Sequence, residues 1–123
     1  MLVAVPCEDN NGLKSRISPH FGRAKYFAFV EVKDNKITNC YVIETPFKSH
    51  GPGDLPNFIK SQGASIVLAY GMGPRAVSFF NSLGIKVITG IVAESVEDAV
   101  MDFLRGTLNI NADWASEIQH DKA

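Results

Sequence analysis

The stretch that decides the fold is "SIVLAYGMGPRAVSFFNSLGIKVIT", residues 65–89. It opens with a continuously apolar run at 65–70, which is typical of a strand covered on both faces. A glycine-rich turn, a segment with helical periodicity and a second β-type run at 85–89 follow. We expect the helix to end at Gly84. Its predicted inward face is Ala76, Val77, Phe79, Phe80 and Leu83. This strand–helix–strand unit predicts two parallel strands joined by a right-handed crossover.

Three more strands are predicted upstream of this unit. "LVAVP", residues 2–6, is a short apolar run closed by proline, and a long polar loop follows at 7–22. The runs at 25–32 and 36–45 are rich in aromatic and β-branched residues and are separated only by the turn "KDNK". They predict an antiparallel hairpin beside the first strand.

Two further helices have start and stop signals. In the first, Asp54 is the expected N-cap and Gly63 the stop, with one apolar face made of Leu55, Phe58 and Ile59. The second opens at Ser95, which resembles a capping box with Asp98, and it ends at Gly106. Its predicted inward face is Val96, Ala99, Val100, Phe103 and Leu104.

The predicted order of elements is therefore β, β, β, α, β, α, β, α. It indicates an α/β fold of three layers, in which a mixed five-stranded sheet lies between helices. We expect a single domain over residues 1–109 and a flexible C-terminal tail over 110–123, because the periodicity is lost after the last helix. Trp114 is the residue of this tail that can dock on the body.

Composition excludes several classes of protein. Charged residues make up 20% of the 123 residues and the net charge is −1, so neither a nucleic-acid partner nor a membrane surface is expected. No apolar run approaches the roughly 18 residues of a membrane span, and the N-terminus does not resemble a signal peptide. Two widely spaced cysteines indicate reduced thiols, and we expect a cytoplasmic protein.

Candidate metal ligands follow from the predicted topology. Ligands of such sheets bind at the carboxyl ends of the parallel strands, where the loops after these strands meet. Cys7 and His20 lie in the loop after the first strand, and His50 lies in the turn "SHGPG". Imidazole and thiolate are ligands of transition metals, so these three residues form a candidate metal site. Their spacing matches no local metal motif, and a purely structural role for each histidine stays open.

The turn "GMGPRA", residues 71–76, follows the strand predicted at 65–70, so we expect it to meet the His20 loop in the same crevice. It is also a candidate binding site of its own. It fits the loose pattern G-x-G-x-x-A, in which a backbone can approach a ligand at the start of a helix. Arg75 adds a forked donor for an anion. The next strand does not end in an acidic residue, which argues against a dinucleotide. A general anion site and a simple tight turn both remain open as interpretations.

No catalytic set is evident. The sequence lacks the G-x-S-x-G elbow of serine hydrolases. Glu8 and Asp9 follow the first strand, but the strands carry none of the acids that a ribonuclease-H-type nuclease needs. We therefore expect no enzymatic activity.

Three longer segments resemble a known family. They are "ISPHFGRAKYFAFVEV", "SHGPGDLPNFIKSQGASIVLAYGMGPRAVSFFNSLGIKVITG" and "VEDAVMDFLRGTL". Together they look like the dinitrogenase iron–molybdenum cofactor biosynthesis family, which includes NifX, C-terminal NifB-like domains and other nitrogenase accessory factors. The similarity covers about residues 1–108.

The resemblance implies a ribonuclease-H-like three-layer fold without nuclease chemistry. It also implies a non-enzymatic binding or carrier protein for an iron–molybdenum or other metal–sulfur cluster, or its precursor, with cluster donor and acceptor proteins as partners. The chain lacks the radical-SAM C-x-x-x-C-x-x-C segment of the fused cluster-synthesising enzymes. The cluster is expected to bind transiently, and the purified protein need not contain it.

The resemblance also assigns roles to residues. The histidine of the H-F-G motif, His20, is the implied cluster ligand, Arg23 balances the charge of an anionic cluster, and His50 is a secondary ligand. Cys7 has no such role in the family, and its candidacy depends on position alone. The full set of expected cofactor-binding residues is His20, Arg23, His50, Gly51, Gly53, Gly71, Gly73 and Arg75. The alternatives are a small-anion or nucleotide sensor at the Gly71–Ala76 turn and a protein-interaction module.

Overall fold

The computed structural model describes residues 1–47 and 51–115 of the chain. The strands are β1 (Leu2–Cys7), β2 (Tyr26–Lys33), β3 (Lys36–Glu44), β4 (Ile66–Leu68) and β5 (Lys86–Ile88). The α-helices are α1 (Asp54–Ser61), α2 (Pro74–Ser82) and α3 (Val96–Arg105), and the 3₁₀ turns are η1 (Gly12–Lys14) and η2 (Phe21–Arg23). None of the helices in these ranges has the length and apolarity needed to cross a bilayer.

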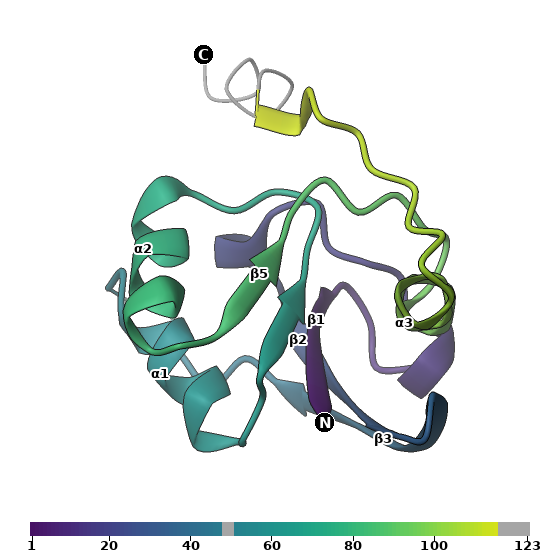
Figure 1. Ribbon diagram of the computed structural model, residues 1–123. Coiled ribbons are helices and arrows are strands. Elements are labelled where there is room, and N and C mark those ends of the chain that lie inside the picture. Colours follow the sequence, from purple (N-terminus) through teal and green to yellow (C-terminus); the bar gives the residue numbers. More distant parts are fainter. Residues whose placement is uncertain (48–50, 116–123) are drawn as a thin grey trace.

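The five strands form one mixed sheet in the order β3-β2-β1-β4-β5 (Figure 1). β1 pairs antiparallel with β2 and β2 antiparallel with β3, whereas β1–β4 and β4–β5 are parallel. The hairpin between β2 and β3 turns at Asp34 and Asn35, which both have positive φ angles, as the short primed hairpin turns require. The predicted mixed five-stranded α/β fold is confirmed.

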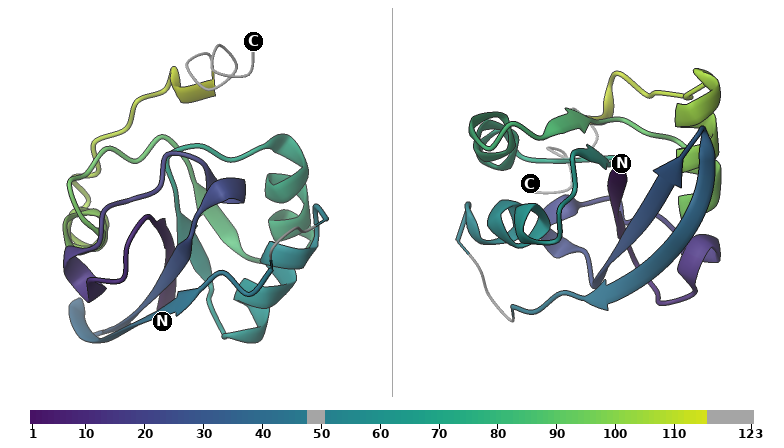
Figure 2. Two further views of the ribbon diagram at one scale, coloured as in Figure 1. Left: turned by 180° about the vertical axis from the view of Figure 1, so that it is seen from behind. Right: turned by 60° about the horizontal axis from the view of Figure 1, so that its bottom comes forward.

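Helices cover both faces of the sheet. α1 and α2 lie on one face and α3 lies on the other, as Figures 1 and 2 show from three directions. Each face has its own buried apolar cluster, so consecutive side chains of β1 enter different clusters: Ala4 belongs to the cluster under α1 and α2, and Val3 and Val5 belong to the cluster under α3. The sheet is therefore the middle of three layers, which explains why its central strands are apolar throughout.

The helix starts agree with the sequence at α3 and differ at α1. Ser95 Oγ accepts a hydrogen bond from the Asp98 N–H at 3.2 Å, the first half of a capping box. At α1 the predicted N-cap was wrong by one position, because Gly53 occupies it and Asp54 is already helical. The Asp54 carboxylate instead accepts a hydrogen bond from the Gly51 N–H at 2.8 Å and so closes the turn before the helix.

One predicted core residue of α2 faces outward. Phe79 is 40% exposed, whereas its neighbour Phe80 is completely buried. Successive helical residues point about 100° apart, so only one of the two rings can occupy the centre of the core. Phe79 instead lies against Gly53, where an added Cβ would come within 3.0 Å of its ring. α2 therefore contacts the turn before α1 through a ring that sequence periodicity assigns to the interior.

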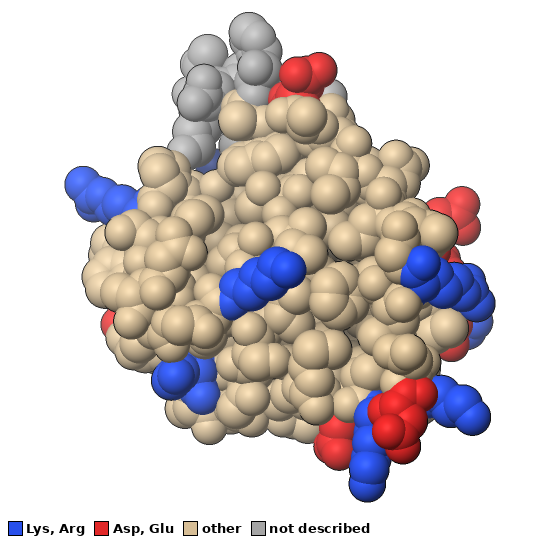
Figure 3. Space-filling model, viewed as in Figure 1, with Lys and Arg blue, Asp and Glu red and all other residues tan. Residues whose placement is uncertain are grey.

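The surface is mixed in charge over the view of Figure 3, with lysines, arginines and acids spread among apolar and neutral residues. The three ion pairs of the described ranges lie near η1, and they join Lys14 to Glu97 and Arg16 to Glu8 and Asp9. All of these side chains are exposed except Asp9, which is partly buried. Exposed pairs of this kind contribute at most about 1 kcal/mol each. The fold therefore depends on its two apolar clusters rather than on surface charge.

Candidate functional site

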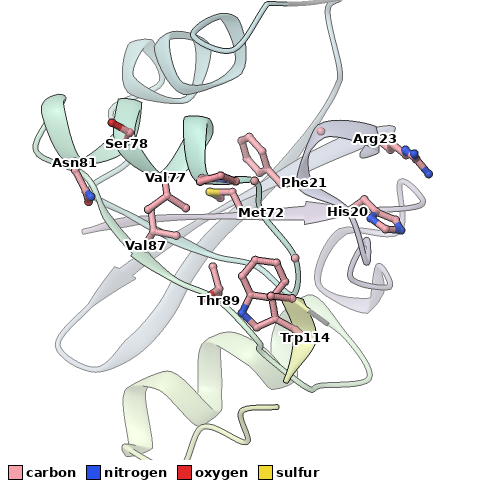
Figure 4. Close-up of a pocket in the computed structure, with 15 residues that line it drawn as sticks. His20, Phe21, Arg23, Met72, Val77, Ser78, Asn81, Val87, Thr89 and Trp114 are labelled. Atoms are coloured by element: carbon pink, nitrogen blue, oxygen red, sulfur yellow. The ribbon is translucent and has the colours of Figure 1, made fainter. Parts of the chain in front are cut away.

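A cavity of about 810 Å³ opens beside α2 at the carboxyl ends of the parallel strands (Figure 4). Its lining comes from the turn 20–23, the turn 71–74, one side of α2, residues 87 and 89, and residues 114–115. This volume lies in the range of small-molecule and cofactor sites. The topological prediction that the His20 loop and the Gly71 turn share one hollow agrees with this geometry.

Backbone pairing holds the His20 turn against the glycine turn. His20 forms an isolated parallel bridge with Gly71, and the Phe21 N–H donates a hydrogen bond to the Gly71 carbonyl at 2.9 Å. The buried Ser18 hydroxyl donates to the His20 carbonyl at 3.0 Å. Both carbonyls of the contact are thus satisfied within the protein, and Gly71 and Gly73 line the cavity next to His20.

Phe21 anchors the turn from inside. Its buried ring packs edge-on against Phe27 and Phe80, with both centroid distances at 5.5 Å. The backbone at His20 is extended, so the imidazole points away from its buried neighbour and stays half-exposed at the cavity rim (Figure 4). Within the described parts of the chain, no hydrogen bond involves the imidazole nitrogens. The turn therefore presents a ring that can accept a ligand.

The cavity walls are mostly apolar. They are formed by Phe21, Met72, Val77, Val87 and Trp114, with Ser78, Asn81 and Thr89 as the polar side chains inside (Figure 4). Arg23 lies at the rim beside His20 and is exposed. Among residues 1–47 and 51–115, no group of three or more His, Cys, Asp or Glu side chains could hold a metal ion. The described site thus offers one imidazole, one guanidinium and a largely apolar wall.

The structure does not bring Cys7 to this cavity. Its side chain is fully buried in the apolar cluster under α3, on the opposite face of the sheet from Phe21. Burial, with a smaller contribution from the Asp9 carboxylate, raises the pKa of the Cys7 thiol to about 12. The thiol therefore keeps its proton at neutral pH, whereas a metal ligand must be a thiolate. The predicted loop position of Cys7 is wrong, because Cys7 is the last residue of β1, and it does not share a site with His20.

The other predicted residues divide between the cavity and the surface. Arg23 lines the cavity, whereas Arg75 lines a separate shallow hollow on the outer side of α2 with Phe79. Gly51 and Gly53 lie in the turn before α1 and do not line the cavity. His50 lies outside the described residues, so its assignment stays a prediction.

Trp114 is a cavity residue that the sequence did not assign to the site. The segment that contains it pairs with the turn after β5, through the Val92 N–H to the Asn109 carbonyl at 2.8 Å. A lone tryptophan in a stretch without periodicity indicates that this side chain docks on the body of the protein, but the sequence does not indicate at which site.

Comparisons with known proteins agree with this architecture. The crystal structure of PH0822 is 52% identical, covers 93% of this chain and 99% of its own, and superposes with a TM-score of 0.86. The apo form of the orange protein from Desulfovibrio gigas is 25% identical with a TM-score of 0.75, covering 90% of this chain and 92% of its own. The uncharacterised protein MJ0580 of Methanocaldococcus jannaschii is 33% identical over 111 residues, or 88% of this chain and 89% of that protein.

A family model agrees with the resemblance that the sequence motifs indicate. The model described as "Dinitrogenase iron-molybdenum cofactor" matches residues 1–106, which include both turns that meet at the cavity and the helices and strands from β1 to α3. The chain therefore belongs to the dinitrogenase iron–molybdenum cofactor family.

Proposed function

We propose that this protein binds and carries an iron–molybdenum or related metal–sulfur cluster, or its precursor, without catalysing a reaction on it. The main supporting observation is the half-exposed His20 imidazole at the rim of the 810 Å³ cavity, in a chain of this family. Cytoplasmic donor and acceptor proteins that load and unload the cluster are part of the same proposal.

The sparse ligand set supports a carrier better than a permanent site. A cluster held by four thiolates is bound tightly, whereas one imidazole and hydrogen bonds to cluster sulfides allow release. Imidazole nitrogen is a suitable ligand for iron, and the Arg23 guanidinium at the rim attracts a cluster of net negative charge. The apolar wall that includes Phe21, Met72 and Val77 keeps water from the rest of the cluster surface. These features of the cavity are consistent with reversible binding of a metal–sulfur cluster.

The anion or nucleotide alternative receives less support from the same turn. Pro74 occupies the first position of α2 and provides no N–H, which removes one of the donors that a phosphate uses at a helix start. Arg75, the expected anion donor, lies in the hollow on the outer side of α2. A thermal-shift series with phosphate, nucleotides and molybdate tests this alternative. A ligand present at 100 times its Kd raises the free energy of unfolding by about 2.7 kcal/mol.

The cluster proposal is tested by anaerobic titration with a synthetic molybdenum–iron–sulfur cluster. We expect His20→Ala to weaken binding by at least about tenfold, since even outer-shell partners of a metal are worth that much. Arg75→Ala is the matched control, because it removes another exposed side chain of the predicted site from outside the cavity. Equal affinity of the wild type and His20→Ala, or no binding to the wild type, contradicts the proposal. Loss of binding only in Arg75→Ala favours the anion site instead.

A further inference from the structure

Residues 107–115, here called the C-terminal strap, continue from the end of α3 past the upper edge of the sheet in the view of Figure 1. Trp114 and Ala115, at the far end of the strap, line the cavity. The family model ends at residue 106, so the strap lies outside the part of the chain that the family match covers.

Hydrogen bonds join the first part of the strap to the turn after β5. The Val92 N–H donates to the Asn109 carbonyl and the Asn111 N–H donates to the Gly90 carbonyl, both at 2.8 Å. The Asn111 side-chain amide donates to the Tyr70 hydroxyl at 3.0 Å. In the described part of the chain, Asn111 is the last strap residue with a hydrogen bond to the body. The strap is thus fixed up to this residue.

Beyond Asn111 the strap folds on itself and reaches the cavity. The N–H groups of Asp113 and Trp114 donate to the side-chain and main-chain oxygens of Asn111, at 3.0 and 3.3 Å. The Trp114 indole, shown beside Thr89 in Figure 4, forms part of the cavity lining. Within residues 112–115, as far as the structure describes them, the contact with the body is the packing of Trp114 at the cavity and beside Gly90.

The packing depends on a glycine. Gly90 is buried with a φ of +78°, and a Cβ there would lie 2.6 Å from the Asn111 carbonyl oxygen and 3.1 Å from Trp114 Cδ1. The first of these atoms is backbone, so a methyl group at position 90 must displace the strap itself. Gly84 has nearly the same φ, +75°, but a Cβ there would meet no atom within 4 Å beyond its chain neighbours. The two glycines therefore have the same backbone conformation, but only at Gly90 would an added methyl group clash with other atoms.

We propose that the strap closes the cavity and that Trp114 retains the cargo there. This rests on the proposed function, and it adds a binding residue from outside the family domain. An indole covers a large apolar area while its ring stays rigid, which suits a wall that excludes water. Cargo enters and leaves when the part of the strap after Asn111 moves away from Gly90. Removing such a wall speeds release much more than it changes capture.

Release kinetics of a synthetic molybdenum–iron–sulfur cluster test the proposal in the full-length protein. We expect Trp114→Ala and Gly90→Ala to release the cluster about tenfold faster, with association rates close to that of the wild type. Gly84→Ala should release it at the wild-type rate, because it has the same backbone strain without the clash. Equal release rates in all four proteins overturn the strap proposal and leave the proposed function intact.

A second readout needs no cargo. Trp114 is the single tryptophan of the chain, so its fluorescence reports the strap alone. We expect acrylamide to quench this fluorescence more strongly in Gly90→Ala than in the wild type and Gly84→Ala. Identical quenching in the three proteins means that the strap is not held on Gly90 and overturns the proposal. A protein that binds no cluster but shows the expected quenching refutes the cargo role of Trp114 and the proposed function, while the strap geometry stands.

Discussion

The two faces of the sheet are covered to different degrees. On one face α3 buries Val96, Ala99 and Val100, and the apolar cluster beneath it is closed. On the other face α2 buries only Phe80 completely, and the cavity lies between this helix and the strand ends. The candidate site therefore lies where a helix leaves the sheet partly uncovered, in a fold whose other face is covered.

Cys7 and His20 illustrate the same difference at the level of single residues. Cys7 is the last residue of β1, His20 lies in the connection that follows it, and both are metal ligands by type. The Cys7 thiol enters the closed face, where burial raises its pKa to about 12, and His20 lies at the rim of the open one. Side-chain direction, rather than proximity in sequence, separates a core residue from a candidate ligand.

The largest expected effect comes from a substitution in the core on the cavity side of the sheet, under α2. Phe80→Ala removes a fully buried ring that packs edge-on against Phe21, and we expect the free energy of unfolding to fall by about 3–5 kcal/mol. Phe79→Ala is the matched control on the same helix, and because its ring is 40% exposed we expect a loss of only about 1 kcal/mol. Urea unfolding of both variants measures the difference. Equal losses would mean that the two rings contribute alike, against the assignment of Phe80 to the core.

A smaller effect is expected from a substitution in the apolar cluster under α3, on the opposite side of the sheet. Cys7→Ala is expected to lower the free energy of unfolding by about 1–2 kcal/mol at neutral pH, because a small buried group is lost. The native thiol keeps its proton up to about pH 12, whereas the unfolded thiol ionises from about pH 9.0. In this window the unfolded state binds fewer protons, so the wild type loses stability as the pH rises.

The measurement is the difference in free energy of unfolding between the wild type and Cys7→Ala from neutral pH to pH 10. We expect this difference to shrink above pH 9.0, since only the wild type contains the buried thiol. Cys40 is present in both proteins, so its ionisation cancels in the comparison. A difference that stays constant across the range shows that Cys7 is not held as a protonated core thiol.

The smallest expected effect comes from substitutions of Ser95, the N-cap of α3. Ser95→Ala removes the hydroxyl that accepts from the Asp98 N–H, and a loss of about 1 kcal/mol is expected. Ser95→Asp keeps an oxygen acceptor at the cap and should retain most of the stability. Thermal unfolding separates these variants. Cluster binding should be unchanged in both, because Ser95 does not line the cavity, and a binding defect in either would link the two faces.

Much of the fold could be predicted because its signals are local. The order of strands and helices follows from hydrophobic periodicity, and the glycine stop after α1 has the expected positive φ. Apart from the one-position shift at the start of α1, the errors are of two kinds. Phe79 and Phe80 both fit the apolar pattern of the helix, but only one of the two rings can lie in the core. The tertiary packing buries Phe80 and leaves Phe79 exposed. The parallel strands β4 and β5 are shorter than the apolar runs that predict them, because the flanking residues remain apolar in the connecting turns.

The site could be predicted in part. Topology correctly brought the His20 loop to Gly71, because loops after neighbouring strands meet at one edge of the sheet. The face of Cys7 could not be read from β1, because both sides of this strand are covered by apolar residues and no polar alternation marks them. The position of Trp114 at the cavity could not be predicted from the sequence for a different reason. Its position depends on bonds between Asn111 and the turn at Gly90, which have no periodic signature.

The bridge between His20 and Gly71 also has a consequence for biosynthesis of the protein. It joins the loop after β1 to the turn after β4, so it forms only when the intervening chain is complete and the parallel crossover has closed. Such non-local contacts come late in folding. A chain whose synthesis has not passed β4 therefore lacks the finished His20 turn, so the cavity exists only in molecules that have reached the native topology.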